Sequence, residues 1–171
     1  MAAIPARRLA INPYGDRYPD DNSTKEVELQ ADGLVTAHTG DRHVLIRWKN
    51  GTDTEGRVYA QITHLSGGPG NYNFHTPQVK MDSEAFRGAD TCHPLGQYTR
   101  AQRGQIIALA KAVDFDRRSR VNNCRTWMHD LLEAMVGANL LSKAEFDKID
   151  VDVPLIKRVA ETSTKSDLNE A

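Results

Sequence analysis

Two stretches in the first half of the chain have the apolar pattern of strands. The segment HVLIRW at 43–48 is short and rich in β-branched and aromatic residues, and RVYAQITHL at 57–65 alternates with a period of two. Between them, NGTDTEG at 50–56 opens with an Asn-Gly pair, which favours a tight turn. This pattern predicts two adjacent antiparallel strands. The segments 77–86 and 92–98 can each supply a further strand or remain a loop.

The second half changes to a helical period. Thr99 and Gln102 have the spacing of a capping box ahead of the apolar-periodic segment 104–113, which predicts a helix. Ser142 and Glu145 repeat that signature and predict a short third helix.

The best-defined helix of the chain is expected to begin near Cys124. Its apolar residues recur three and four positions apart, and Gly137 stands where a left-handed C-terminal cap would fall. They are Trp127, Met128, Leu131, Leu132, Met135 and Val136. So wide an apolar stripe needs a partner, and the strands are the only one of suitable size. The sequence therefore predicts an α+β fold in which a small antiparallel sheet packs against this helix.

The remaining segments lack a sustained period. Residues 1–32 carry three prolines and a polar cluster, and we expect an arm or a wrapped loop there. The segment SGGPGNYNFHTP at 66–77 is expected to be a loop because glycine and proline break regular structure. Residues 159–171 are polar and small, which is typical of a frayed tail. A single domain over 33–158 is the resulting expectation.

Composition narrows the setting. The chain has 171 residues and 39% hydrophobic content, enough for one core, and its 22 basic and 23 acidic residues give a net charge of −1. Such a balance does not predict binding to nucleic acid. No stretch resembles a signal peptide or a membrane span, so we expect a cytoplasmic protein with both of its cysteines reduced and no membrane insertion.

Cys124 has two interpretations. Asn122 or Asn123 is a favoured N-cap, which would place Cys124 in the first helical turn, where the macrodipole stabilises a thiolate. Alternatively, a free cysteine is often a small buried hydrophobic residue. Position alone does not decide between a nucleophile and a packing residue.

Two histidines are candidates to activate that thiol. His43 opens the first expected strand and His64 ends the second, and a tight antiparallel pair would bring the two imidazoles together. Cys124, His43 and His64 would then serve as nucleophile, base and orienter. We interpret the other four histidines as ordinary residues, with His75 the main exception because it follows the glycine-rich loop; they are His38, His75, His93 and His129.

Metal binding is not expected. Cys92-His93 could be combined with Cys124 and His129 into a zinc set, but helical spacing puts Cys124 and His129 on different faces. Cys92 also has no Cys-x-x-Cys partner. We therefore predict neither a bound metal nor another cofactor.

The order of these motifs resembles a known group of proteins. RHVLIRW, then QITHLSGG, then NNCRTWM is similar to the permuted papain-like proteins, which include lecithin:retinol acyltransferase-like proteins, NlpC-type endopeptidases and PPPDE-like proteins. The match falls on His43, His64 and Asn123-Cys124, and it spans about 41–141. The chain also resembles uncharacterised fungal proteins with an Asn-Cys helix. This resemblance implies a permuted papain-like fold and thiol chemistry.

The leading hypothesis is a cysteine-dependent hydrolase or acyl-transfer enzyme. Cys124 would attack an amide, ester or thioester of a small molecule or peptide, His43 would transfer the proton, and His64 would fix its tautomer. We expect the substrate to contact Asn123, Trp127, Gly68, Tyr72 and His75.

Two alternatives stay open. One is a non-catalytic scaffold of the same fold that binds a small molecule or a protein. The other is a non-covalent cyclase or isomerase that uses His43 and His64 as acid and base.

Overall fold

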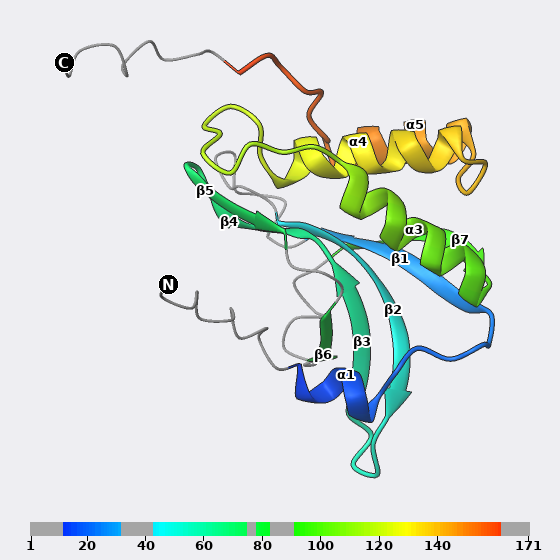
Figure 1. Cartoon of the computed structure of the whole chain (residues 1–171). Coiled ribbons are helices and arrows are strands. Elements are labelled where there is room, and N and C mark those ends of the chain that lie inside the picture. The colour runs from blue at the N-terminus through cyan, green and yellow to red at the C-terminus, as the bar shows by residue number, and fades with distance from the viewer. Residues whose placement is uncertain (1–11, 32–42, 75–77, 83–90, 162–171) are drawn as a thin grey trace, which may run out of the picture.

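The described residues form a five-stranded antiparallel sheet, with a layer of helices on one face, and a separate two-stranded hairpin (Figure 1). The computed structural model describes residues 12–31, 43–74, 78–82 and 91–161. The strands are β1 (Lys25–Ala31), β2 (Val44–Thr52), β3 (Val58–Thr63), β4 (Leu65–Gly68), β5 (Asn71–Phe74), β6 (Gln78–Asp82) and β7 (Thr91–Tyr98). The helices are α1 (Pro13–Arg17), α3 (Arg100–Ala112), α4 (Cys124–Gly137) and α5 (Lys143–Asp152). The predicted α+β class, with a small antiparallel sheet and a few helices, is confirmed.

The main sheet has five strands in the order β6-β3-β2-β1-β7. Strand β1 pairs with both β2 and β7 and so lies inside the sheet, although residues 1–32 were expected to form an arm. That part of the expectation is wrong. Val27, Leu29 and Ala31 are fully buried and alternate with polar residues, so the segment has the period of a strand. The alternating pattern of β1 covers only seven residues and follows a segment rich in proline and charged residues, so it is too short to predict a strand from the sequence.

The hairpin predicted from 43–65 is present as β2 and β3, which pair antiparallel. Its turn lies further along the chain than expected. The Asn50-Gly51 pair belongs to β2, where the register shifts, and the turn is formed by Asp53 to Gly56. The Asp53 carboxylate accepts hydrogen bonds from the backbone N–H groups of Glu55 and Arg57, and these bonds close the turn. The further segments also form strands, β6 and β7.

A second hairpin occupies most of the segment expected to be a loop. Strands β4 and β5 pair antiparallel over 65–74. Gly67 has φ +97, and a Cβ there would lie 2.1 Å from the carbonyl oxygen of Asn71, so the glycine permits this close approach. The loop before α4 is joined to the hairpin, because Gly70 donates to Ser119 O at 2.8 Å. The glycines therefore shape a tight hairpin rather than exclude one.

The helical layer follows the capping signals in the sequence. The capping boxes at Thr99 and Ser142 are both present, at the starts of α3 and α5. The C-terminus of α4 differs from the expectation, because Gly137 remains helical and Asn139 adopts the left-handed conformation, with φ 57. Leu140 N–H then bonds Met135 O, which satisfies a carbonyl at the end of the helix.

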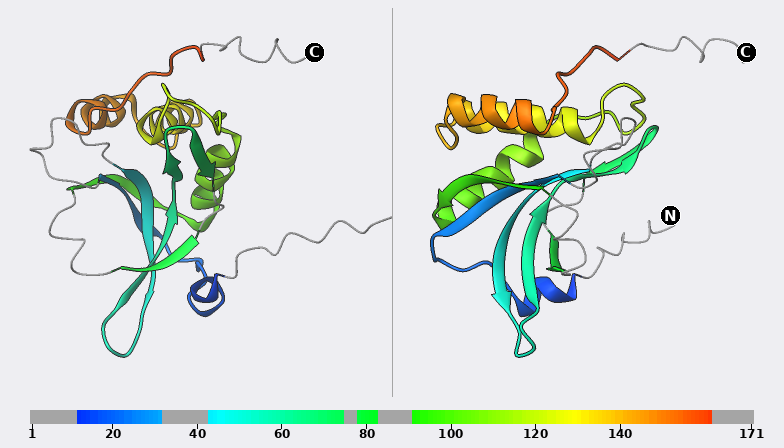
Figure 2. Two further views of the ribbon diagram at one scale, coloured as in Figure 1. Left: turned by 90° about the vertical axis from the view of Figure 1, so that its left-hand side faces the viewer. Right: turned by 180° about the vertical axis from the view of Figure 1, so that it is seen from behind.

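The core lies between the sheet and the three longer helices, which cover one face of the sheet in both views of Figure 2. The apolar stripe of α4 provides its centre, with Trp127, Met128, Leu131, Leu132 and Met135 all at most 1% exposed. The prediction that α4 packs against the sheet is confirmed, since this stripe shares one hydrophobic cluster with Val44, Ile46 and Trp48 of β2. None of the described helices is both long and apolar enough to cross a bilayer.

Two polar connections fix the described ends of the chain. Arg103 of α3 is fully buried and binds Asp20, which draws the segment before β1 onto the helical layer. At the other end, the Asn122 side chain donates to Val159 O at 2.8 Å and to Glu161 at 2.7 Å. Of the tail expected over 159–171, the first three residues thus lie against the loop before α4, and 162–171 fall outside the described residues.

Candidate acid–base site on the sheet

The structure brings His43 and His64 into direct contact. Nε2 of His43 lies 2.6 Å from Nδ1 of His64, and the two rings meet edge to face with centroids 4.8 Å apart. This is hydrogen-bond distance between two ring nitrogens, so one of them donates and the other accepts. The expected pairing of the two imidazoles across the hairpin is therefore present.

Strand alternation explains which way both rings point. His43 directly precedes β2 and His64 directly follows β3, and each alternates with a residue of the core, Val44 and Leu65 respectively. Because Val44 and Leu65 belong to the cluster that includes α4, the imidazoles lie on the opposite face of the sheet. A one-residue change of register would turn them into the core.

That face is hollowed into a pocket of about 270 Å³ that both imidazoles line. Its floor comes from the outward-facing positions of the strands, and it is lined by Gln30, His43, Leu45, Arg47, Ala60, Ile62, His64, Lys80, Met81 and Asp82. A larger hollow of about 680 Å³ adjoins it, and the two share Gln30 and Arg47. The imidazole pocket and the adjoining hollow together have room for a small molecule. The lining of the imidazole pocket combines apolar floor residues with a few polar groups.

The charged groups of the pocket have different surroundings. Arg47 Nη2 lies 2.6 Å from the Asp82 carboxylate and its Nη1 donates to Gln30 at 3.0 Å, so this guanidinium is fixed in place. Burial of the imidazole, followed by the charge of Lys80, lowers the pKa of His43 below its ordinary value of 6.5. His43 is therefore predominantly neutral at pH 7.

When both rings are neutral, the pair carries both an acid and a base. If His43 Nε2–H donates, His43 keeps a lone pair on Nδ1 and His64 keeps a hydrogen on Nε2; if His64 Nδ1–H donates, the roles are exchanged. In both cases one outer nitrogen can accept a proton and the other can donate one. The two roles are exchanged when one outer nitrogen gains a proton, the other loses one, and the shared proton moves along the 2.6 Å contact.

Cys124 lies elsewhere in the fold. It is the first residue of α4, 9% exposed, and it belongs to the hydrophobic cluster on the helix side of the sheet. Asn123 is its N-cap, as one of the two expected alternatives, and the side chain accepts hydrogen bonds from the N–H groups of Arg125 and Thr126. Cys124 is not among the residues that line the imidazole pocket.

The expected substrate contacts fall mostly on packing residues. Trp127 and Tyr72 are 1% and 4% exposed and belong to the core, where Trp127 stacks obliquely on Phe74 with centroids 5.5 Å apart. Gly68 lies in β4, in the paired part of the second hairpin. His75 lies outside the described residues. Contact of any of them with a substrate stays a prediction.

Several residues of the pocket were not found from the sequence. Arg47, Lys80 and Asp82 face the imidazoles from β2 and β6, and the latter two alternate in a short segment of uncertain type. The signal was the period of two, which puts residues 43, 45 and 47 on one face. Lys80 and Asp82 join the pocket because β6 lies beside β3, and the sequence pattern does not show that pairing.

The residues considered for a metal do not come together as a zinc set. Cys92 is exposed and lines the larger hollow, and Nδ1 of His93 lies 4.0 Å from Asp152. The only group within metal-binding reach among the described residues contains His129 with two neighbouring carboxylates on α4.

The chain matches no protein-family model, no curated protein and no solved structure.

Proposed function

We propose that the chain is an enzyme that moves a proton within a small carbonyl compound, with His43 and His64 as its acid and base. The observation that carries this proposal is the 2.6 Å contact between the two ring nitrogens in a pocket of about 270 Å³. It corresponds to the non-covalent isomerase or cyclase alternative of the sequence analysis. The depressed pKa of His43 supports it, because a base must be unprotonated at working pH.

The step balances without a cofactor. The outer nitrogen that holds the lone pair removes a proton from the carbon beside a carbonyl, the electron pair of the C–H bond forms a C=C bond, and the π electrons of the carbonyl move onto its oxygen. The other outer nitrogen, which holds a hydrogen, gives that hydrogen to a second atom of the substrate. Shift of the shared proton from the first ring to the second then makes both rings neutral again, with the acid and base roles exchanged, and the product is an isomer of the substrate.

Lys80 supports the choice of substrate. It lines the pocket beside His43, and its charge would stabilise the negative oxygen that develops when the proton leaves. Arg47 is less suited to that role because Asp82 and Gln30 already bind it. A small carbonyl compound with a carboxylate, which a single ammonium group could attract, fits these charges best.

The test is proton exchange into solvent deuterium. Small 2-oxo acids, beginning with pyruvate and 2-oxoglutarate, are incubated with the full chain in D2O, and deuterium at the carbon beside the carbonyl is followed by proton NMR. We expect incorporation above the buffer rate, reduced about 100-fold or more in His43→Gln and in His64→Gln. Absence of exchange across a panel of such acids would contradict the proposal.

His93→Gln is the matched control, because His93 is a partly buried histidine of the same sheet that does not line the pocket. It should retain the wild-type rate, and so should Cys124→Ser. Exchange that survives in both pocket variants would come from another site.

A second function is favoured by the position of Cys124 at a capped helix start. In this proposal the fold is permuted papain-like, Cys124 is the nucleophile of a hydrolase or acyl-transfer enzyme, and His43 is its base. The macrodipole and the first-turn N–H groups would favour the thiolate. The burial of Cys124, and the opposite face occupied by the imidazoles, make this the less supported of the two.

Acyl transfer from p-nitrophenyl acetate distinguishes this second function. A thiol enzyme should release a burst of p-nitrophenol and gain one acetyl group on Cys124, seen by intact mass, and Cys124→Ser should lose both. Equal rates in the wild type and Cys124→Ser would exclude it.

A further inference from the structure

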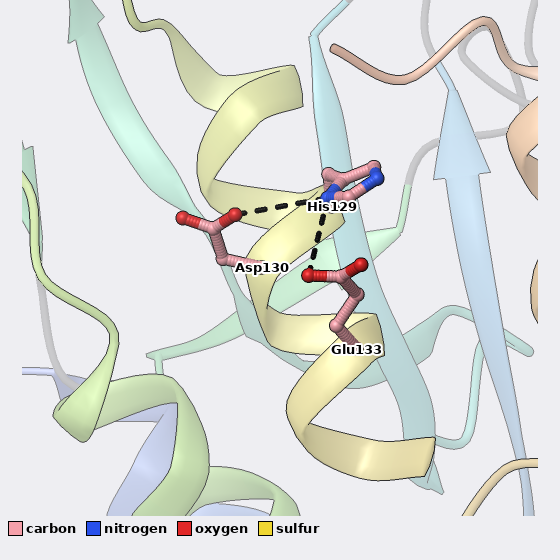
Figure 3. Close-up of side chains that lie close together, drawn as sticks. All are labelled: His129, Asp130 and Glu133. Carbon is pink, nitrogen blue, oxygen red and sulfur yellow. Dashed lines mark ion pairs between the residues drawn. The ribbon is translucent and has the colours of Figure 1, made fainter. Parts of the chain in front are cut away.

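A cluster on α4, away from the imidazole pocket, gathers one histidine and two carboxylates. Nδ1 of His129 lies 3.7 Å from Oδ1 of Asp130 and 3.8 Å from Oε2 of Glu133. Figure 3 shows both carboxylates on the side of the ring that carries this nitrogen. His129 and Glu133 are four positions apart, so the helix places them on one face, and the ligand atoms of all three lie within 4.8 Å of one another.

The surroundings of His129 point to a ligand. Its side chain is 3% exposed, and neither ring nitrogen has a hydrogen-bond partner among the described residues. The Phe146 ring of α5 contacts the His129 ring edge to face, with centroids 5.3 Å apart, so one side of the imidazole has an apolar neighbour. Leaving a buried polar group without a partner is costly, and here one of the unsatisfied nitrogens faces two acids.

We propose that His129, Asp130 and Glu133 bind a divalent transition-metal ion such as Zn²⁺. One imidazole nitrogen and two carboxylate oxygens are ligands that this class of metal accepts. Ligand atoms about 2.1 Å from a tetrahedral ion are separated by roughly 3.4 Å. The observed 3.7 and 3.8 Å from His129 Nδ1 are close to that spacing, and the two carboxylate oxygens, which lie within 4.8 Å of each other, are to be brought to the same spacing by the exposed Glu133 side chain.

The two acids differ in how they would serve the ion. Asp130 is held, because its second oxygen Oδ2 accepts a hydrogen bond from Arg158 Nε at 2.6 Å while Oδ1 faces His129. Arg158 in turn donates to Asp114 O, so it orients the carboxylate as an outer partner of a metal ligand does. Glu133 is 60% exposed, which gives the ion a route from solvent and lets that side chain adjust.

The competing interpretation is an ion-pair cluster without metal, in which His129 interacts only with the carboxylates of Asp130 and Glu133. Arg158 already supplies one positive charge to Asp130, which lowers the attraction for a cation there. Direct measurement of metal binding separates the two.

The experiment is calorimetric titration of Zn²⁺ into the untagged full chain after treatment with EDTA and removal of the chelator. We expect one ion per chain and a loss of affinity in Glu133→Gln and in Asp130→Asn. Each loss should exceed the roughly 10-fold to 100-fold typical of an outer-shell partner, because a direct ligand is removed. Both substitutions keep the size of the side chain and act at solvent-accessible positions, so circular dichroism should show an unchanged fold.

Asp147→Asn is the matched control, since Asp147 is a similarly exposed acid in an i,i+4 ion pair on the adjacent helix α5. It should bind Zn²⁺ as the wild type does. A chain that shows no saturable binding, or equal affinity in the wild type and Glu133→Gln, overturns the proposal and leaves the ion-pair cluster. Shift of the His129 ring signals in long-range proton–nitrogen NMR on adding Zn²⁺ gives a second readout.

Discussion

Arg103 and Asp20 form a two-point ion pair between α3 and the segment before β1. Nε and Nη2 of the guanidinium each lie 2.9 Å from one carboxylate oxygen, and the Arg103 side chain is fully buried. Its remaining N–H groups donate to the backbone carbonyls of Ser23, Tyr98 and Asp21. One buried cation therefore joins the N-terminal segment, the end of β7 and a helix.

Removing the carboxylate should destabilise the fold strongly. Asp20→Ala leaves the buried Arg103 without its counter-ion, and breaking a buried pair in this way costs about 3–5 kcal/mol. Urea unfolding followed by circular dichroism measures the change. Asp147→Asn, which breaks an exposed pair with Lys143, should cost less than about 1 kcal/mol. Similar effects of the two substitutions would contradict a structural role for the buried pair.

The ion pair between Arg103 and Asp20 also makes the free energy of unfolding depend on pH in the acidic range. Burial alone would raise the pKa of Asp20, but hydrogen bonds from Arg103 and Lys25 outweigh it and hold the pKa below its ordinary value of 3.8. A carboxylate with a depressed folded-state pKa contributes stability above pH 3.8, and the contribution is lost as pH falls through the folded value. Unfolding free energies measured from pH 6 down to about pH 2.5 should therefore fall less steeply in Asp20→Asn than in the wild type.

Lys80 should control the protonation of His43. Lys80→Gln removes a nearby positive charge, so the pKa of His43 should rise toward 6.5 while burial still holds it below that value. Long-range proton–nitrogen NMR of the ring across pH 4–8 measures the shift. The lowered pKa of His43 also makes stability depend on pH. Because the unfolded chain takes up the proton more readily than the folded chain, the free energy of unfolding falls as pH drops below about 6.5. A lower pKa in Lys80→Gln would refute the assigned cause.

The two cysteines should differ in reactivity toward iodoacetamide. Cys92 is exposed, whereas Cys124 is 9% exposed within the core cluster, so we expect Cys92 to be alkylated first in the native protein. Intact-mass analysis across a pH series, with Cys92→Ala as the reference, measures both rates. Faster labelling of Cys124, slowed by His43→Ala, would favour the thiol enzyme instead.

Asn123 should act as a helix cap. Its side chain accepts from Arg125 N–H at 2.9 Å and from Thr126 N–H at 3.3 Å, and losing these bonds in Asn123→Ala should cost about 1 kcal/mol. Asn123→Asp keeps the acceptor and should retain most of the stability in thermal unfolding. If Asn123 instead binds a substrate through its amide, activity would be lost in Asn123→Asp while stability is kept.

The sequence predicted those elements whose local signals agree. Local signals predict the helices. The capping boxes at Thr99 and Ser142 each lie within one helical turn, and the apolar stripe of α4 lies on one face of one helix, so these helices are predictable without knowing which elements they pack against. The hairpin carrying His43 and His64 was predictable for the same reason. Its turn was misplaced because Asp53 and Gly56 close the chain more effectively than the Asn-Gly pair ahead of them.

Other features depended on contacts between distant segments. Strand β1 is defined by its pairing with β2 and β7, and its short alternation acquires meaning only inside the sheet. The side of the sheet on which His43 lies follows from the burial of Val44 against α4, which the sequence pattern of β2 alone does not specify. Residue types and motif order predict that Cys124 lies beside the imidazoles, whereas Cys124 belongs to the core cluster and the imidazoles line a pocket on the opposite face of the sheet.

The interior position of β1 also bears on how the chain reaches its native state. Lys25 pairs with Tyr98 in the ladder between β1 and β7, so of the described strands the first to be synthesised pairs with the last. Pairing across so long a separation closes a large loop before it gains contacts, which slows folding. The β2–β3 hairpin, by contrast, can form as soon as it is synthesised. Until β7 arrives, one edge of β1 stays open to pairing with other chains, which makes the nascent protein prone to aggregate.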